Sequence, residues 1–160
     1  MGVTASGLFV KNMIDVFDAT QLAIDLSLST HKIALFTNSI TPSFSNDTAY
    51  GVSPYDSNEV TTTTYWPAGG VALSAAAVGG TDTSPTLTES PTGTMMYDMG
   101  NVSVASTTLV NARCALLYAD ALAGNWGIVL VNFGGDYSTS NGIFGIQWAG
   151  TGVFTVDWTP

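Results

Sequence analysis

Basic residues are almost missing from this chain. Lys11, Lys32 and Arg113 stand against twelve acidic residues, and charged residues make up only 9% of the sequence. Proteins that bind a phosphate backbone or an anionic membrane surface need several Lys or Arg side chains to do so. The composition therefore argues against direct binding of nucleic acid and against attachment to an anionic membrane.

Cysteine and histidine occur once each. Cys114 cannot form an internal disulfide, and its place in an apolar run favours a small buried hydrophobic residue over a reactive thiol. His31 has no second imidazole and no cysteine or carboxylate at zinc-ligand spacing. We expect it to be a solvated residue at the start of a strand, and we predict no metal centre and no cofactor.

Sequence signatures of catalysis are also missing. No serine lies in a G-x-S-x-G turn, and no glycine pair is followed by the Lys-Ser/Thr of a phosphate-binding loop. His31 is the sole candidate base for a Ser-His-acid triad. Twelve acids leave room for a glycosidase pair, but no context marks one. The prediction is that the chain is not an enzyme.

The amino terminus and the longest apolar stretch give no sign of secretion or membrane insertion. The first residues, MGVTASGLFVKN, lack a basic start and a continuous apolar segment, so we expect synthesis and folding in a cytoplasm. Residues 114–133 have the length of a membrane span. Asp120, Asn125 and Asn132 would then lie in hydrocarbon, at up to roughly 3 kcal/mol for the charge. We interpret this stretch as two strands joined by a turn.

The second half of the chain predicts four consecutive strands at 113–119, 127–133, 142–148 and 153–158. Each is a short apolar or alternating run bounded by Gly, Asn, Asp or Ser. In the last strand Phe154, Val156 and Trp158 share one face. Residues 128–131 lack polar alternation, which is typical of a strand covered on both faces in the middle of a sheet.

One helix is predicted at 6–18, capped by Thr4 or Ser6, because apolar residues recur at three- and four-residue spacing. We assign its apolar stripe to core packing, with a docking helix through Phe9, Met13 and Val16 as the alternative. A strand at 32–37, runs at 60–65, 71–78 and 95–104, and a connection at 79–91 complete the pattern. We predict a mainly β chain: one β-rich domain over 1–160, with a helical segment at 1–20 and an antiparallel β-sandwich or jelly-roll-like body at 32–158.

The loop at 38–59 offers two further candidate sites. Asp47, Asp56 and Glu59 carry the oxygen ligands that Ca²⁺ prefers, although no EF-hand spacing is present, so we interpret them as solvated loop acids. Loop aromatics form the other candidate, a stacking surface for a glycan or a partner made of Tyr50, Tyr55 and Trp66. Trp148 and Trp158 are expected in the core instead.

The order of several motifs resembles a known family, the small accessory virion proteins of tailed bacteriophages, which include head decoration, head fibre and minor structural proteins. After the short helix, the matching segments are AIDLSLSTHKIALFTNSITPS, an acidic stretch ending in SNEV, WPAGGVAL, YDMGNVSVASTTLVNARCALLY and NFGGDYSTSNGIFGIQWAGTGVFTV.

The resemblance implies a β-sandwich-like structural protein of the virion, made in the host cytoplasm and present in many copies. We expect a capsid decoration or minor capsid protein that binds the major capsid protein or other virion proteins. Copies of the chain would form a trimer or a lattice-bound unit, through apolar, charge-poor contacts. The alternative is a minor tail or fibre protein that binds a host receptor or surface glycan.

Overall fold

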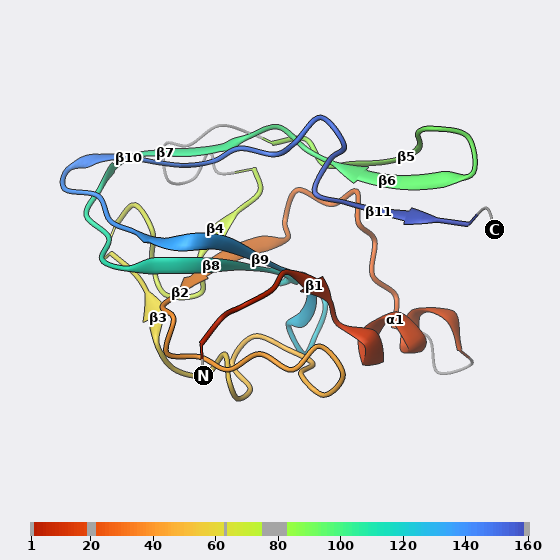
Figure 1. Ribbon diagram of the computed structural model, residues 1–160, viewed down its shortest axis with the longest axis horizontal. Coiled ribbons are helices and arrows are strands. Elements are labelled where there is room, and N and C mark those ends of the chain that lie inside the picture. The colour runs from red at the N-terminus through yellow and green to blue at the C-terminus, as the bar shows by residue number, and fades with distance from the viewer. Residues whose placement is uncertain (1, 19–21, 63, 75–82, 159–160) are drawn as a thin grey trace.

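The computed structural model describes residues 2–18, 22–62, 64–74 and 83–158. It is mainly β, with one helix and antiparallel sheets, consistent with a β-sandwich-like domain as predicted (Figure 1). The elements are β1 (Gly7–Leu8), α1 (Val10–Phe17), β2 (Lys32–Phe36), β3 (Glu59–Val60), β4 (Val71–Ala72), β5 (Thr86–Glu89), β6 (Thr94–Asp98), β7 (Val102–Thr107), β8 (Ala112–Ala119), β9 (Trp126–Tyr137), β10 (Gly142–Ile146) and β11 (Phe154–Asp157).

A six-stranded sheet is the centre of the molecule. Its strand order is β1-β9-β8-β2-β3, and β4 also pairs with β2. The predicted hairpin is confirmed: β8 and β9 are antiparallel, with Leu116 opposite Leu130. β9 lies between β8 and the short β1, and Ile128, Val129 and Leu130 are buried, as expected for a strand covered on both faces.

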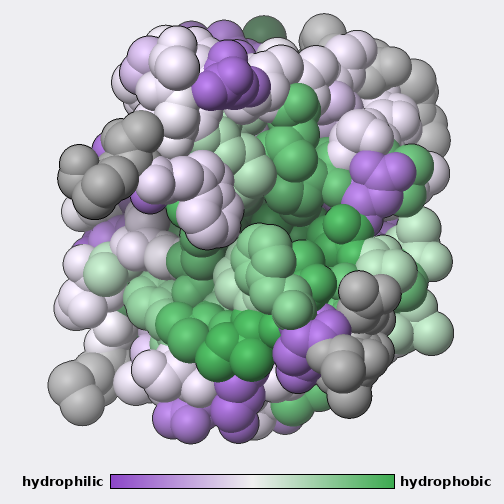
Figure 2. Space-filling model, turned by 90° about the vertical axis from the view of Figure 1, so that its right-hand side faces the viewer, coloured by the Kyte–Doolittle hydropathy of each residue, from purple (hydrophilic) through white to green (hydrophobic). Residues whose placement is uncertain are grey.

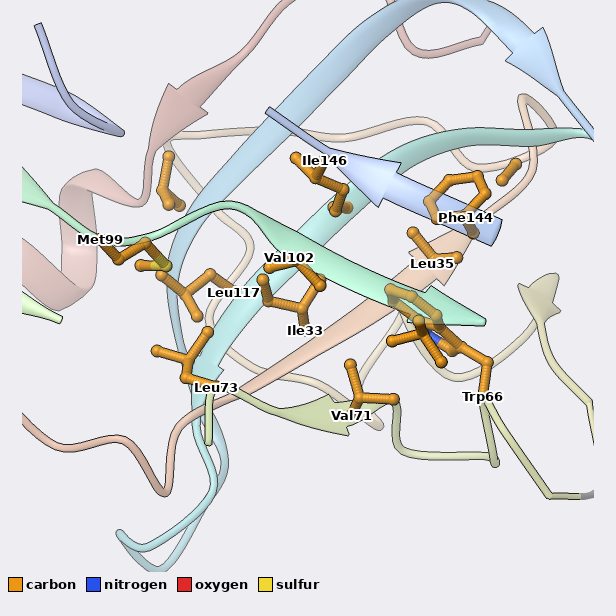
Figure 3. Close-up of a cluster of buried hydrophobic side chains, with 14 of the residues drawn as sticks. Ile33, Leu35, Trp66, Val71, Leu73, Met99, Val102, Leu117, Phe144 and Ile146 are labelled. Atoms are coloured by element: carbon orange, nitrogen blue, oxygen red, sulfur yellow. The ribbon is translucent and has the colours of Figure 1, made fainter. Parts of the chain in front are cut away.

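Alternation along β8 supplies both faces of this sheet with apolar side chains, because successive strand residues point to opposite sides. Leu117 belongs to one buried cluster, together with Ile33, Val102 and Ile146 from β2, β7 and β10 (Figure 3). Cys114, Leu116 and Tyr118 belong to a second cluster, which includes Phe9, Ile40 and Tyr55. The small sheets therefore cover one face, and the N-terminal segment and the loop after β2 cover the other.

Two smaller antiparallel sheets cover one face of the main sheet, and together we call them the covering layer. β10 pairs with β7, and the order of the other sheet is β11-β6-β5. The predicted strands at 142–148 and 153–158 are confirmed, with shorter ends, and the predicted break at Gly100 and Asn101 separates β6 from β7. β5 is a correction, because the connection expected at 79–91 contains this strand.

The predicted Thr-rich run and the run of small residues form only short strands. The structure describes β3 and β4 there, while residue 63 and residues 75–78 lie outside the described part of the chain.

The helix starts later than predicted, at Val10, because Gly7 and Leu8 pair with β9 as strand β1. Its N-cap is Phe9, which has no side-chain cap. The predicted cap at Ser6 is wrong, since the Ser6 hydroxyl accepts a hydrogen bond from the Asn132 backbone N–H at 2.8 Å. Among the described residues, no helix is long and apolar enough to cross a membrane.

Candidate functional site

The loop aromatics predicted as a stacking surface lie mostly inside the protein. Tyr55 and Trp66 are 1% and 0% exposed. Tyr50 is half-buried, stacked on Tyr118 with ring centroids 4.7 Å apart, and its hydroxyl donates to Glu59 at 2.9 Å. The prediction of an exposed contact surface is wrong for Tyr55 and Trp66, because the loops that carry them cover the sheet.

Two of the three loop acids considered for calcium have separate hydrogen-bond partners. The Asp47 carboxylate accepts the Ser43 backbone N–H at 2.7 Å, and the Glu59 carboxylate accepts the Gly69 N–H at 2.9 Å. Asp56 is exposed. Within the described residues, no three His, Cys, Asp or Glu side chains are grouped to hold a metal ion. Burial raises the pKa of Glu59, which is consistent with a structural role.

His31 is buried rather than solvated, which corrects the prediction. Its side chain is 1% exposed, and Nε2 lies 2.6 Å from the Asp25 carbonyl oxygen. That contact requires a proton on Nε2, since a carbonyl oxygen can only accept. Burial lowers the pKa of His31, so the neutral ring is favoured, and His31 acts as a structural residue before β2.

The side chain of Asn12 fixes the rotation of α1. It is fully buried, and its amide nitrogen donates to the carbonyl oxygens of Thr48 at 2.6 Å and Gly127 at 2.7 Å. Phe9, at the start of the helix, is also fully buried, with its ring edge-on to Tyr55 at 5.9 Å. The helix is therefore attached to β9 and to the loop after β2 through this side.

The rotation of α1 leaves an apolar stripe in solvent. Val10, Ile14 and Phe17 are 49%, 57% and 72% exposed. The predicted docking stripe was Phe9, Met13 and Val16, of which Phe9 is in the core and the other two are half-buried. The exposed stripe therefore consists of Val10, Ile14 and Phe17, which also recur at helical spacing, and not of the residues predicted for docking.

A groove of about 500 Å³ separates α1 from the β11-β6-β5 sheet. Met13, Val16 and Phe17 line it from the helix, and the sheet contributes Leu87, Met95, Phe154 and Val156. Trp158 also lines the groove, with its ring edge-on to Phe17 at 6.2 Å. Figure 2 looks at this end of the molecule and shows apolar side chains gathered around the hollow.

Two neighbouring hollows extend the apolar surface. One, of about 530 Å³, lies along Val10, Ile14 and Phe17 on the helix. The other, of about 420 Å³, lies beside Leu87, Met95 and Trp158. Because both share residues with the main groove, we treat the three as one surface, the helix–β11 groove.

Carboxylates are the charged groups of the helix–β11 groove. Asp18, Asp25 and Glu89 line it, and no basic side chain does so among the described residues. Hydrogen bonds from the Ser27 hydroxyl and backbone N–H lower the pKa of Asp25, so this carboxylate is ionised at neutral pH. The groove is therefore an apolar surface with an acidic rim.

β11 gives the groove one more recognition feature, a free strand edge. In the described part of the chain β11 pairs only with β6, and it is the strand of its sheet nearest to α1 (Figure 1). An edge strand presents backbone N–H and C=O groups that can pair with another extended segment. The groove can thus offer backbone hydrogen bonds as well as apolar contacts.

The sequence pattern predicted one apolar strand face of this site but not the groove itself. It placed Val156 and Trp158 on one face of the last strand, but it assigned Trp158 to the core, whereas Trp158 is 61% exposed. The alternation of apolar residues in this strand indicated the site, because an apolar face on an edge strand needs other residues to cover it.

Comparison with protein-family models, with curated proteins and with solved structures found no match for this chain.

Proposed function

We propose that the chain is a structural component of a bacteriophage virion, a multi-copy capsid decoration or minor capsid protein that docks through the helix–β11 groove. The observation that carries the proposal is the open apolar groove itself. Monomeric soluble proteins rarely expose large contiguous apolar patches, and such patches mark interaction sites. The sequence resemblance to accessory virion proteins supports the same function.

Charge indicates which partner fits the groove. The rim carries Asp18, Asp25 and Glu89, and the whole chain has a formal net charge of −9. Two copies meeting groove to groove would bring like charges together, which disfavours association. A different virion protein, such as the major capsid protein, fits better if it offers an apolar segment flanked by Lys or Arg.

An extended segment is the best-fitting shape for that partner. Pairing with the free edge of β11 would satisfy its backbone, and alternate side chains would enter the apolar groove. Phe17 and Trp158 line the groove as large exposed side chains, and aromatic residues of this kind are enriched in the cores of protein interfaces.

Co-sedimentation with virus particles tests the proposal. Purified wild-type chain should pellet with particles of the virus that encodes it, prepared without the chain, whereas Phe17→Asp should bind roughly 30-fold more weakly or not at all. Ile143→Asp is the matched control, because Ile143 is 67% exposed, close to the 72% of Phe17, and lies away from the groove. Equal binding of all three proteins would refute docking through the groove.

Antibody labelling of whole particles separates the capsid function from the alternative of a minor tail or fibre protein. Label over the head supports the proposal, label confined to the tail favours the alternative, and absence of the chain from purified particles would contradict both.

Self-association into a trimer remains a prediction. Light scattering on the purified chain tests it, and a monomer at high concentration would leave only the lattice-bound arrangement, in which each copy is held by another protein.

A further inference from the structure

A second groove lies between β9 and β10, toward the end of the molecule opposite α1 and β11 (Figure 1). Its volume is about 520 Å³, within the range typical of small-ligand sites. The walls come from residues 131–133, 137–139 and 143–148, that is, from the second half of β9, the following turn, β10 and the two residues after it. We call it the β9–β10 groove.

Aromatic rings in the β9–β10 groove are held in place by neighbours. Trp148 is half-buried, its Nε1 donates to the Gly100 carbonyl oxygen at 3.1 Å, and its backbone N–H donates to Asn101 Oδ1 at 3.0 Å. Tyr137 is 53% exposed and packs edge-on against Phe133, with ring centroids 6.1 Å apart. Rings positioned before binding lose little conformational entropy when a ligand stacks on them.

Neutral hydrogen-bonding groups share the groove with these rings. Gln147 is exposed, and the Asn132 side-chain oxygen accepts the Gly134 backbone N–H at 3.0 Å, which orients the amide group. Ser138 Oγ accepts the Asn111 N–H at 3.0 Å, which leaves its own proton to donate. No charged side chain is among the described lining residues, although the chain contains twelve acids.

We infer that the β9–β10 groove binds a neutral saccharide. A sugar ring presents an apolar C–H face, which stacks on an aromatic ring, and a border of hydroxyls, which pair with amides and hydroxyls. Tyr137 and Trp148 supply the first kind of contact, and Asn132, Ser138 and Gln147 supply the second. Phosphorylated, sulfated or carboxylated sugars fit poorly, because the lining offers no cation and the chain is strongly negative.

This inference is independent of docking at the helix–β11 groove. The two grooves share no lining residue, and they lie toward opposite ends of the longest axis of the molecule (Figure 1). A chain attached to a particle by its helical end would therefore present the β9–β10 groove to the outside. Tyr50, Tyr55 and Trp66, the aromatics expected to bind glycans, take no part in it.

A glycan array probed with the full chain is the first test, with neutral oligosaccharides of hexoses and N-acetylhexosamines printed beside sialylated and sulfated ones. The neutral saccharide that binds best is then titrated by calorimetry. We expect binding to neutral saccharides only, weakened about tenfold or more by Tyr137→Ala and measurably by Gln147→Ala.

Two controls make the test specific. Tyr65→Ala removes another exposed tyrosine, 40% exposed, and Phe17→Asp disrupts the other groove, so both should bind the saccharide like the wild type. Unchanged melting temperatures would show that the variants are folded. No binding to any neutral saccharide at millimolar concentration, a preference for anionic sugars, or affinity that survives Tyr137→Ala would overturn the inference.

Discussion

Trp66 provides the most direct test of the core packing. Its side chain is fully buried and lies edge-on to Phe144 of β10, with ring centroids 5.4 Å apart, between the main sheet and the covering layer (Figure 3). Replacing a buried Trp by Ala typically costs about 3–5 kcal/mol, from lost burial and the cavity left behind. That is a large share of the roughly 5–15 kcal/mol that stabilises most domains.

The conservative change should behave differently. The Trp66 indole N–H has no hydrogen-bond partner among the described residues, and leaving a buried donor unpaired costs about 1–3 kcal/mol. Trp66→Phe keeps an aromatic ring and removes that donor. The free energy gained by removing the unpaired donor offsets part of the free energy lost with the larger ring. We expect its unfolding free energy to fall by less than half as much as that of Trp66→Ala.

Urea denaturation followed by far-UV circular dichroism measures both changes. Trp158→Ala is the control, because Trp158 is 61% exposed and should cost about 1 kcal/mol at most, mainly its contact with Phe17. If Trp66→Ala stayed within about 1 kcal/mol of the wild type, Trp66 would not be a core residue and its assignment to the sandwich interior would be wrong.

Three further predictions concern the scaffold. Burial lowers the pKa of His31 below its ordinary 6.5, so as the pH falls the unfolded chain is protonated at His31 before the folded chain is. The free energy of unfolding should therefore fall below about pH 6.5, and it should fall less in His31→Gln. Urea titrations at several pH values measure both. Gly70 and Gly51 both have a positive φ, of +76° and +80°. An added Cβ at Gly70 would overlap the Ile33 carbonyl oxygen, whereas a Cβ at Gly51 would face open space. In the same denaturation assay, Gly70→Ala should therefore lower the unfolding free energy clearly more than the roughly 1–2 kcal/mol expected for Gly51→Ala. Burial raises the pKa of Cys114 to about 12, so a thiol reagent should label it only in denaturant, and rapid labelling of the native chain would contradict this.

The fold could be predicted largely from the sequence because strand periodicity is a local signal. The run from Arg113 onward alternates or stays apolar between clear turn residues, and each predicted strand there is present. β5 was missed for the opposite reason. Leu87 is its sole large apolar residue, and all four of its residues are exposed, so it has no buried face to leave a pattern.

The candidate site depended on information that is not local. Two stripes of α1 fit helical spacing equally well, and the buried amide of Asn12, bonded to residues 36 and 115 positions away, decides which one packs. Tyr55 and Trp66 occupy loops in the sequence, but the loop of Tyr55 covers one face of the main sheet, and Trp66 packs between the other face and the covering layer. A position in a loop therefore predicts exposure only where other elements already cover the core.

The positions of the few charged residues bear on the proposed docking at the helix–β11 groove. An open apolar groove beside a free strand edge would be a hazard for a protein present in many copies, as proposed for this chain, because such surfaces promote self-association. Asp18, Asp25 and Glu89 line that groove, so two copies meeting there would bring like charges together, whereas a basic partner would be attracted. The same carboxylates would therefore serve two purposes, keeping free chains apart before assembly and selecting the surface on which they finally dock.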